Sequence, residues 1–159
     1  MDTQLEKHVG ECLRQRGWRL AIAESCTGGL LGHRITNVPG SSTYYMGSIT
    51  AYAYDAKVRL LGITWETLEK YGAVSKETVI AMARGVRRVL SSDIGLSVSG
   101  IAGPGGGTPD KPVGLTWIGL SVANMDEAWK NVWKGDRLQI KEQTADQALR
   151  ILLNHLCGD

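Results

Sequence analysis

Residues 19–29 read Arg19-Leu20-Ala21-Ile22-Ala23-Glu24-Ser25-Cys26-Thr27-Gly28-Gly29, a short apolar run followed directly by a loop of hydroxyl and glycine residues. The run over residues 19–23 is typical of a buried β-strand. Residues 27–36 favour a helix, because a hydroxyl group before the first turn can cap its free backbone N–H groups. A strand that leads at once into a helix is one unit of an α/β domain, and such domains bind ligands where their strands end.

The rest of the chain repeats this alternation of strands and helices. Apolar residues at helical spacing predict an opening helix before Gly17, and Ser75 precedes an amphipathic helix that extends to about Leu90. A short helix carries Lys57 and ends near Gly62. The other expected elements are strands over residues 43–53, 94–98, 113–122 and 128–133 and a final helix over 138–156. The hairpin at 124–126 makes the sheet mixed, so we expect one domain over residues 1–159, a three-layer α/β/α sandwich.

The composition is that of a soluble globular domain. The 159 residues are 43% hydrophobic and 21% charged, and no apolar run approaches the roughly 18 residues of a membrane helix. The net charge is +2 with no dense Lys/Arg cluster, so neither nucleic acid nor a membrane is an expected partner. Residues 1–16 lack the apolar core of a secretory signal, which predicts a cytoplasmic protein. Cys12, Cys26 and Cys157 are widely spaced, so we expect free thiols and no metal site.

Two loops rich in glycine and hydroxyl groups are candidates for binding an anionic ligand. The first, residues 24–29, precedes a helix whose initial N–H groups can hold a phosphate, with Thr27 and Gly28 among the contacts. The alternative is a tight turn in which Ser25 and Thr27 only cap that helix. The second, residues 99–107, contains five glycines, which let backbone amides approach a ligand closely. Its alternative interpretation is a mobile connector between two strands.

Ser42, Tyr52 and Lys57 lie between the two loops and form a candidate catalytic set. A serine hydroxyl attacks an amide carbonyl poorly unless a base removes its proton, and no histidine here lies in a pattern that indicates a catalytic triad. A lysine can be that base if a dry site lowers its pKa by roughly 2–3 units from the usual value of about 10.4. The apolar neighbours of Lys57 favour this, and a solvated surface lysine is the alternative.

A series of short blocks resembles the CinA carboxy-terminal domain family, whose stand-alone members are nicotinamide-nucleotide amidases. In chain order the blocks are Ala23-Glu24-Ser25-Cys26-Thr27-Gly28-Gly29, Pro39-Gly40-Ser41-Ser42, Tyr52 with Lys57, Gly72-Ala73-Val74-Ser75, Ser99-Gly100-Ile101-Ala102-Gly103-Pro104, Lys111-Pro112-Val113-Gly114 and Gly135-Asp136-Arg137. The resemblance covers essentially the whole chain. It implies a three-layer fold and hydrolysis of the carboxamide of nicotinamide mononucleotide to nicotinate mononucleotide and ammonia, a step of pyridine nucleotide recycling.

The resemblance also implies roles for single residues. It places the nucleophile on Ser42, the base on Lys57 and an assisting tyrosine on Tyr52. Ligand-contacting positions fall on Ser25, Ser99, Gly100 and Arg137. We expect backbone N–H groups near the turn at residues 39–42 to stabilise the oxyanion, Arg137 to bind the phosphate, and no cofactor or metal to be needed.

Alternative functions follow from the same residues. Many relatives carry Asn where this chain has Tyr54, which favours an amidase for a different small amide. The loops would also suit a non-catalytic module that binds a pyridine nucleotide while Lys57 stays charged. An interaction domain for competence or DNA damage is disfavoured, because the sequence has no basic stripe. A homo-oligomer, a dimer or larger, is consistent with the family.

Overall fold

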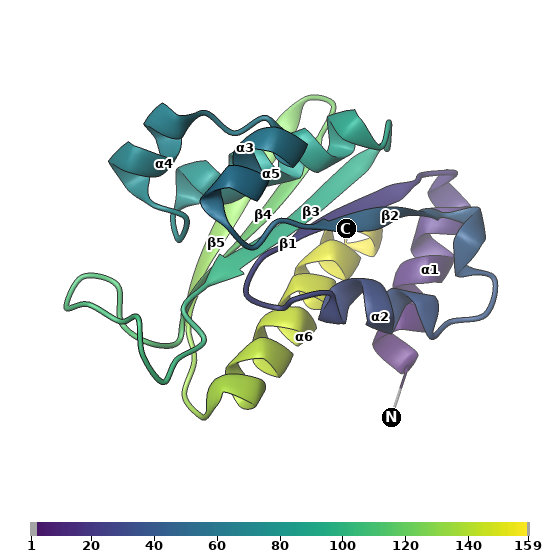
Figure 1. Ribbon diagram of the computed structural model, residues 1–159. Coiled ribbons are helices and arrows are strands. Elements are labelled where there is room, and N and C mark those ends of the chain that lie inside the picture. Colours follow the sequence, from purple (N-terminus) through teal and green to yellow (C-terminus); the bar gives the residue numbers. More distant parts are fainter. Residues whose placement is uncertain (1–2, 159) are drawn as a thin grey trace.

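A mixed five-stranded sheet forms the middle layer of the computed structural model, which describes residues 3–158 (Figure 1). The strands are β1 (Leu20–Glu24), β2 (Tyr45–Thr50), β3 (Ile94–Gly100), β4 (Leu115–Val122) and β5 (Met125–Val132), and their spatial order is β2-β1-β3-β4-β5. β1 pairs in parallel with β2 and with β3, whereas β4 is antiparallel to β3 and to β5. The loops that leave β1, β2, β3 and β5 therefore meet at one end of the sheet, here named the carboxyl edge.

Helices cover both faces of the sheet and complete the three layers (Figure 1). One face carries α1 (Gln4–Arg16), α2 (Leu30–Thr36) and α6 (Arg137–Cys157), and the other carries α3 (Tyr54–Leu61), α4 (Trp65–Tyr71) and α5 (Lys76–Val89). Side chains alternate along β1, so Leu20 and Ile22 pack into the first layer of core while Ala21 and Ala23 pack into the second. The predicted α/β fold with a mixed sheet is confirmed.

Element boundaries differ from the sequence prediction in several places; α2 begins at Leu30 instead of residue 27, and β5 begins at Met125, inside the expected turn. The expected strand over residues 43–53 is shorter, because a 3₁₀ turn, η1 (Ser41–Thr43), precedes β2 and an irregular segment follows it. Helix α4 was not predicted. Only Leu68 of its seven residues is buried, so the sequence shows no helical repeat there. The predicted cap of α5 is confirmed, since Ser75 accepts a hydrogen bond from the Thr78 N–H at 3.2 Å.

The expectation that all three cysteines are free thiols is wrong. Cys12 on α1 and Cys157 at the end of α6 form a disulfide, and Cys26 is the free cysteine of residues 3–158. The two half-cystines are 145 residues apart in sequence, yet their Cα atoms lie 6.1 Å apart because α1 and α6 pack side by side. Sequence spacing alone could not reveal this pairing. Among the helices of residues 3–158, none has the length and apolar character that crossing a membrane requires.

Loss of this disulfide is expected to destabilise the domain without affecting the carboxyl edge of the sheet. A bond that closes so long a loop restricts the unfolded chain, and its removal typically costs about 2–4 kcal/mol. Urea unfolding of the Cys12→Ser variant should therefore show a lower free energy of unfolding than the oxidised wild type. A reductant should lower the stability of the wild type and leave that of the variant unchanged. Equal stability of wild type and variant under oxidising conditions would contradict the prediction.

Candidate active site

The carboxyl edge of the sheet collects all but one of the residues predicted to form the site. In chain order they are Ser25, Thr27, Gly28, Tyr52, Lys57, Ser99, Gly100 and Arg137. The first three follow β1, the next two follow β2, the following two end β3, and the last opens α6 just after β5. They converge because these four strands point in the same direction.

Ser42 is the exception, and its predicted pairing with Lys57 is wrong. Ser42 lies in η1, just before β2, whereas Lys57 lies on α3, which follows β2. The strand has six residues, and at about 3.3 Å per residue its two ends are roughly 16 Å apart. The turn at residues 39–42, expected to supply oxyanion donors, lies at that opposite end of the sheet as well (Figure 1).

Lys57 instead lies beside Ser25. Its Nζ atom is 3.0 Å from Ser25 Oγ, 2.7 Å from the carbonyl oxygen of Ala51 and 3.0 Å from that of Tyr52. The two carbonyls can only accept, so they orient two N–H bonds of the amine, and the third tetrahedral position faces Ser25 Oγ. In a neutral amine that position holds the lone pair. The arrangement therefore aims a basic lone pair at the Ser25 hydroxyl.

Burial makes Lys57 a lysine that can lose its proton near neutral pH. Its side chain is 0% exposed, and burial lowers its pKa from an ordinary value of 10.5 to about 8. Its three hydrogen-bond partners are uncharged oxygens, so no carboxylate holds the ammonium form in place. The alternative of a solvated surface lysine is wrong for Lys57.

Cys26 follows Ser25 directly and is the other nucleophile near this position. Its side chain is buried, and burial raises the pKa of its thiol to about 12. The thiol is therefore protonated at neutral pH, and a protonated thiol is a poor nucleophile. Ser25, which has an adjacent amine, is the better candidate.

The sequence predicted that backbone N–H groups at the start of α2 bind a ligand anion. In the structure a carboxylate of the chain itself accepts hydrogen bonds there. The fully buried Glu24 carboxylate accepts hydrogen bonds from the Leu31 N–H at 2.9 Å and the Gly32 N–H at 3.1 Å. The Thr27 hydroxyl donates to the same carboxylate at 2.7 Å and does not cap the helix. The hypothesis that a hydroxyl caps α2 is therefore wrong. The hypothesis of a phosphate site at this helix start is wrong for the Leu31 and Gly32 N–H groups, which Glu24 already engages.

Arg137 and Tyr52 form the exposed rim of the site. The Arg137 guanidinium donates to the Gly103 carbonyl oxygen at 2.7 Å and to the Tyr52 hydroxyl at 3.1 Å. The first contact ties the start of α6 to the glycine-rich loop, and the second ties it to the segment after β2. Tyr52 is 61% exposed, so its side chain is accessible from solvent.

The end of β3 lies directly beside Ser25. The Ser25 N–H donates to the Val98 carbonyl oxygen at 3.1 Å, which places the buried Ser99 next to the candidate nucleophile. Packing explains why position 100 is a glycine, since a β-carbon there would stand 2.9 Å from the Leu115 carbonyl oxygen on β4. No side chain larger than hydrogen fits at that position.

The glycine-rich loop is attached to the body of the domain at both ends. Gly103 is held by Arg137, and the Lys111 amine donates to the Tyr71 carbonyl oxygen at 2.6 Å, at the end of α4. Residues 104–110 between these two contacts are exposed. The loop extends beyond the carboxyl edge of the sheet in Figure 1.

Tyr54 lies on α3 with Lys57, but its hydroxyl is not among the hydrogen-bond partners of the Lys57 amine. Its hydroxyl accepts a hydrogen bond from the Ala73 N–H at 3.2 Å and so ties α3 to the segment before α5. A shorter side chain such as Asn does not reach that far. Tyr54 therefore helps to position the helix that carries Lys57.

Lys141 is a further cationic side chain at the carboxyl edge, and it was not among the predicted site residues. It lies one helical turn after Arg137 on α6, and its Nζ is 3.8 Å from where a β-carbon on Gly28 would stand. The i, i+4 spacing from Arg137 was the available signal, because it places both side chains on the same face of the helix. In residues 3–158, no cluster of three His, Cys, Asp or Glu residues could hold a metal ion.

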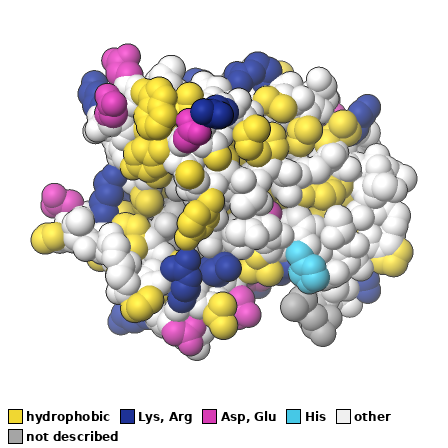
Figure 2. Space-filling view, viewed as in Figure 1, with side chains coloured by type: hydrophobic (Ala, Val, Ile, Leu, Met, Phe, Trp, Pro, Cys, Tyr) yellow, Lys and Arg dark blue, Asp and Glu magenta, His cyan; other side chains and the backbone are white. Residues whose placement is uncertain are grey.

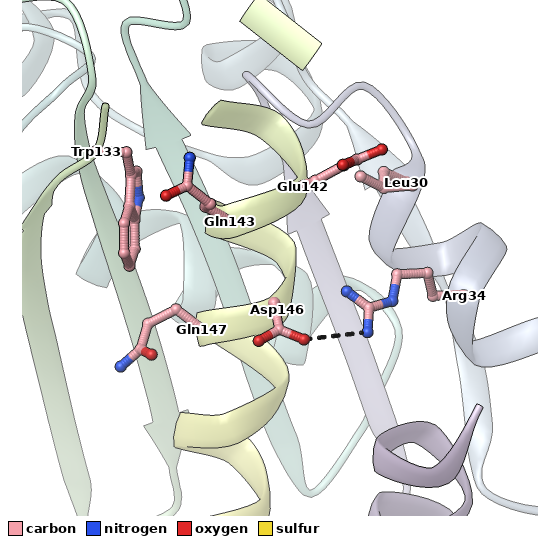
Figure 3. A pocket seen from close by; sticks show the side chains of 7 residues that line it. All are labelled: Leu30, Arg34, Trp133, Glu142, Gln143, Asp146 and Gln147. Atoms are coloured by element: carbon pink, nitrogen blue, oxygen red, sulfur yellow. Dashed lines mark hydrogen bonds and ion pairs between the residues drawn. The ribbon is translucent and has the colours of Figure 1, made fainter. Parts of the chain in front are cut away.

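A separate cavity of about 500 Å³ lies along α6 (Figure 3). Arg34 on α2 reaches toward Asp146 on α6 at 3.5 Å, and Trp133 lies on the other side of the helix. The Trp133 indole N–H donates to the Thr116 hydroxyl at 2.9 Å. None of the predicted site residues lines this cavity, so it is distinct from the Ser25–Lys57 site.

Comparison with known proteins gives consistent matches along the chain. Residues 2–156 match the CinA C-terminal domain. A "Putative competence-damage inducible protein" of Moorella thermoacetica is 48% identical over 155 residues, which are 98% of this chain and 37% of that protein. A "CinA-like protein" of Salinibacter ruber is 48% identical over 148 residues, 93% of this chain and 36% of that protein. The chain thus spans little more than a third of these curated relatives.

Solved structures agree with the sequence matches. A "Competence-Damaged Protein (CinA) Superfamily Protein" from Klebsiella pneumoniae superposes with a TM-score of 0.94 at 31% identity and covers 98% of both chains. A "competence/damage inducible protein" from Agrobacterium tumefaciens gives a TM-score of 0.91 at 35% identity, covering 96% of this chain and 94% of that one.

Proposed function

The chain belongs to the CinA C-terminal domain family, and from this premise we propose that it is an amidase that hydrolyses the carboxamide of nicotinamide mononucleotide. The products are nicotinate mononucleotide and ammonia. The family resemblance implies this reaction. The single observation that carries it for this chain is the buried Lys57 amine, 3.0 Å from the Ser25 hydroxyl.

In the proposed first step the neutral Lys57 amine accepts the proton of the Ser25 hydroxyl. Ser25 Oγ then forms a bond to the carboxamide carbon, and the carbonyl oxygen takes up the electron pair as an oxyanion. The carbonyls of Ala51 and Tyr52 hold the amine in the orientation that this transfer needs. Backbone N–H groups of the turn at residues 26–29 are the proposed oxyanion donors, because this turn adjoins the nucleophile.

In the proposed second step the carbon–nitrogen bond breaks and ammonia leaves. The leaving nitrogen must gain a proton, and in this proposal Tyr52 relays to it the proton that Lys57 took from Ser25, which leaves Lys57 neutral again. The Tyr52 hydroxyl oxygen accepts a hydrogen bond from Arg137, which leaves its own proton free to be donated. Water then attacks the acyl-serine, the neutral Lys57 takes a proton from that water and returns it to Ser25 Oγ as the bond between Oγ and the acyl carbon breaks, and nicotinate mononucleotide is released.

A second candidate function is a binding module without turnover. The three oxygen partners of Lys57 can accept all three hydrogens of a charged ammonium, so the same contacts also suit a permanently protonated lysine. Calorimetry would then detect binding of nicotinamide mononucleotide, while no ammonia would appear. The two functions differ only in whether Lys57 loses its proton.

Ammonia release from the purified chain is the direct test of the proposal. Nicotinamide mononucleotide should yield nicotinate mononucleotide and ammonia in equal amounts, detected by a coupled ammonia assay and chromatography. Other small carboxamides, such as free nicotinamide and glutamine, serve as comparison substrates. Turnover of one of these in preference to the mononucleotide would reassign the substrate, and no turnover with any of them would reject the amidase.

The rate of ammonia release is expected to rise with pH through the pKa of Lys57. Only the neutral amine can accept a proton, and burial lowers the pKa of Lys57 to about 8. Below that pKa the neutral fraction grows about tenfold per pH unit, so kcat/KM should follow with a slope near one and level off above it. A profile that is flat between pH 6 and 9 would contradict Lys57 as the base.

A further inference from the structure

Two helix starts at the carboxyl edge, those of α2 and α6, are already occupied by carboxylates of the chain itself. Glu24 accepts from the first turn of α2 at Leu31 and Gly32, and Asp136 accepts from the Gln139 N–H of α6 at 2.9 Å. A helix start is the usual place for a phosphate in an α/β domain, because its N–H groups are free there. At α2 and α6 the carboxylates already engage such groups, so cationic side chains are the partners left for a phosphate beside these two helices.

Arg137 and Lys141 are cationic side chains at this edge that meet the requirement. They lie four residues apart on the first turns of α6, on one face of the helix. Arg137 contacts Gly103 of the glycine-rich loop, and Lys141 reaches Gly28 of the loop after β1. In Figure 2, Lys and Arg side chains gather on the face of the molecule where α6 begins.

Lys141 is available for a ligand, unlike other cations nearby. In residues 3–158 it takes part in no ion pair, whereas Arg34 on α2 is paired with both Glu6 and Asp146. The positive charge of Lys141 also acts on the interior of the loop. It lowers the pKa of Cys26, which burial raises by a larger amount. A phosphate monoester carries a charge of about −1.5 to −2 at pH 7, which one guanidinium and one ammonium balance.

We propose that Lys141 binds the phosphate group of the substrate together with Arg137 and thereby selects a mononucleotide over the nucleoside that lacks the phosphate. The inference rests on the proposed function, because it assigns a selectivity to the same site. Lys141 does not take part in the chemical step. Its ammonium holds the phosphate near Gly28, while Arg137 holds it from the glycine-rich loop, and this directs the carboxamide toward Ser25.

The test compares two substrates that differ only in the phosphate. Lys141→Met should lower kcat/KM for nicotinamide mononucleotide by roughly 10- to 100-fold, the usual loss for a hydrogen bond to a charged group. Its kcat/KM for nicotinamide riboside should stay within about twofold of the wild type, because that substrate has no phosphate for Lys141 to bind. Lys141→Arg should retain most of the selectivity. Lys134→Met, which removes an exposed lysine just before α6, is the matched control and should behave as wild type.

Two other kinetic outcomes would decide against the inference. Equal losses for both substrates would mean that Lys141 supports the fold or the nucleophile, and no loss for either would mean that it does not touch the phosphate. If the wild type releases no ammonia, calorimetry with nicotinamide mononucleotide gives the same comparison. Binding that weakens in Lys141→Met would then support the phosphate contact although the amidase proposal fails. Binding that is unchanged in Lys141→Met, or absent in the wild type, would overturn the inference.

Discussion

Ser25→Ala is expected to reduce ammonia release from nicotinamide mononucleotide by roughly a thousandfold or more, because the nucleophile is lost. Ser42→Ala is the matched control. It removes the same hydroxyl from an exposed serine at the opposite end of β2, so its activity should equal that of the wild type. The pair separates the nucleophile that the geometry favours from the one that the sequence blocks suggested.

The Ser25→Ala variant should remain folded. The substitution leaves one buried hydrogen bond to Lys57 unmade, which costs about 1–2 kcal/mol at most, and thermal unfolding measures that loss. Retention of more than a tenth of the wild-type rate in a folded Ser25→Ala protein would rule out Ser25 as nucleophile. Loss of activity in Ser42→Ala would argue that a second site contributes to the reaction.

Lys57→Met is expected to abolish turnover and to reveal a pH-dependent cost of burying the lysine. Between pH 8 and 10.5 the unfolded chain binds a proton at this position that the folded chain does not, because burial lowers the folded pKa from 10.5 to about 8. The stability of the wild type relative to the variant should therefore rise with pH across this window. From pH 7 to pH 10 the relative gain in unfolding free energy should be roughly 2–3 kcal/mol, at about 1.4 kcal/mol for each unit of pKa shift.

Urea unfolding of wild type and Lys57→Met at the two pH values measures this difference. Lys130→Met, which removes an exposed lysine from β5, is the control and should follow the wild type at both values. A wild-type stability that falls relative to Lys57→Met on going from pH 7 to pH 10 would reverse the predicted sign. Such a result would mean that the folded protein favours the charged lysine, as the binding-module alternative requires.

The sequence identified Lys57 correctly as an unusual lysine but paired it with the wrong serine. Its apolar neighbours were compatible with a buried amine, with a solvated surface lysine as the alternative, and the structure gives it 0% exposure. The position of Ser42, between the two loops in the chain, suggested proximity to Lys57. Closeness in sequence is misleading across a strand, because an extended chain of six residues moves its ends far apart, whereas Ser25 and Lys57 meet across neighbouring parallel strands.

From its position, the loop after β1 was predicted to bind a phosphate at the start of α2. In the structure the Glu24 carboxylate occupies that place. Glu24 ends a fully buried strand, so its carboxylate must find partners inside the domain. The nearest free donors are the first N–H groups of α2. Lys141 was missed because its i, i+4 spacing from Arg137 points to this site only once the packing of α6 against the loop is known.

Apart from α4, the order of strands and helices could be derived from the sequence, as could the class of fold, the capping of α5 and the set of loops at the carboxyl edge. These features depend on local spacing, on which residues alternate or recur, and on the rule that parallel strands end together. Only the tertiary structure decided three other features. They are the Cys12–Cys157 disulfide, the Ser25–Lys57 contact and the hydrogen bonds from the start of α2 to Glu24. Each joins atoms whose distance depends on how whole elements pack, and no local pattern in the chain encodes that distance.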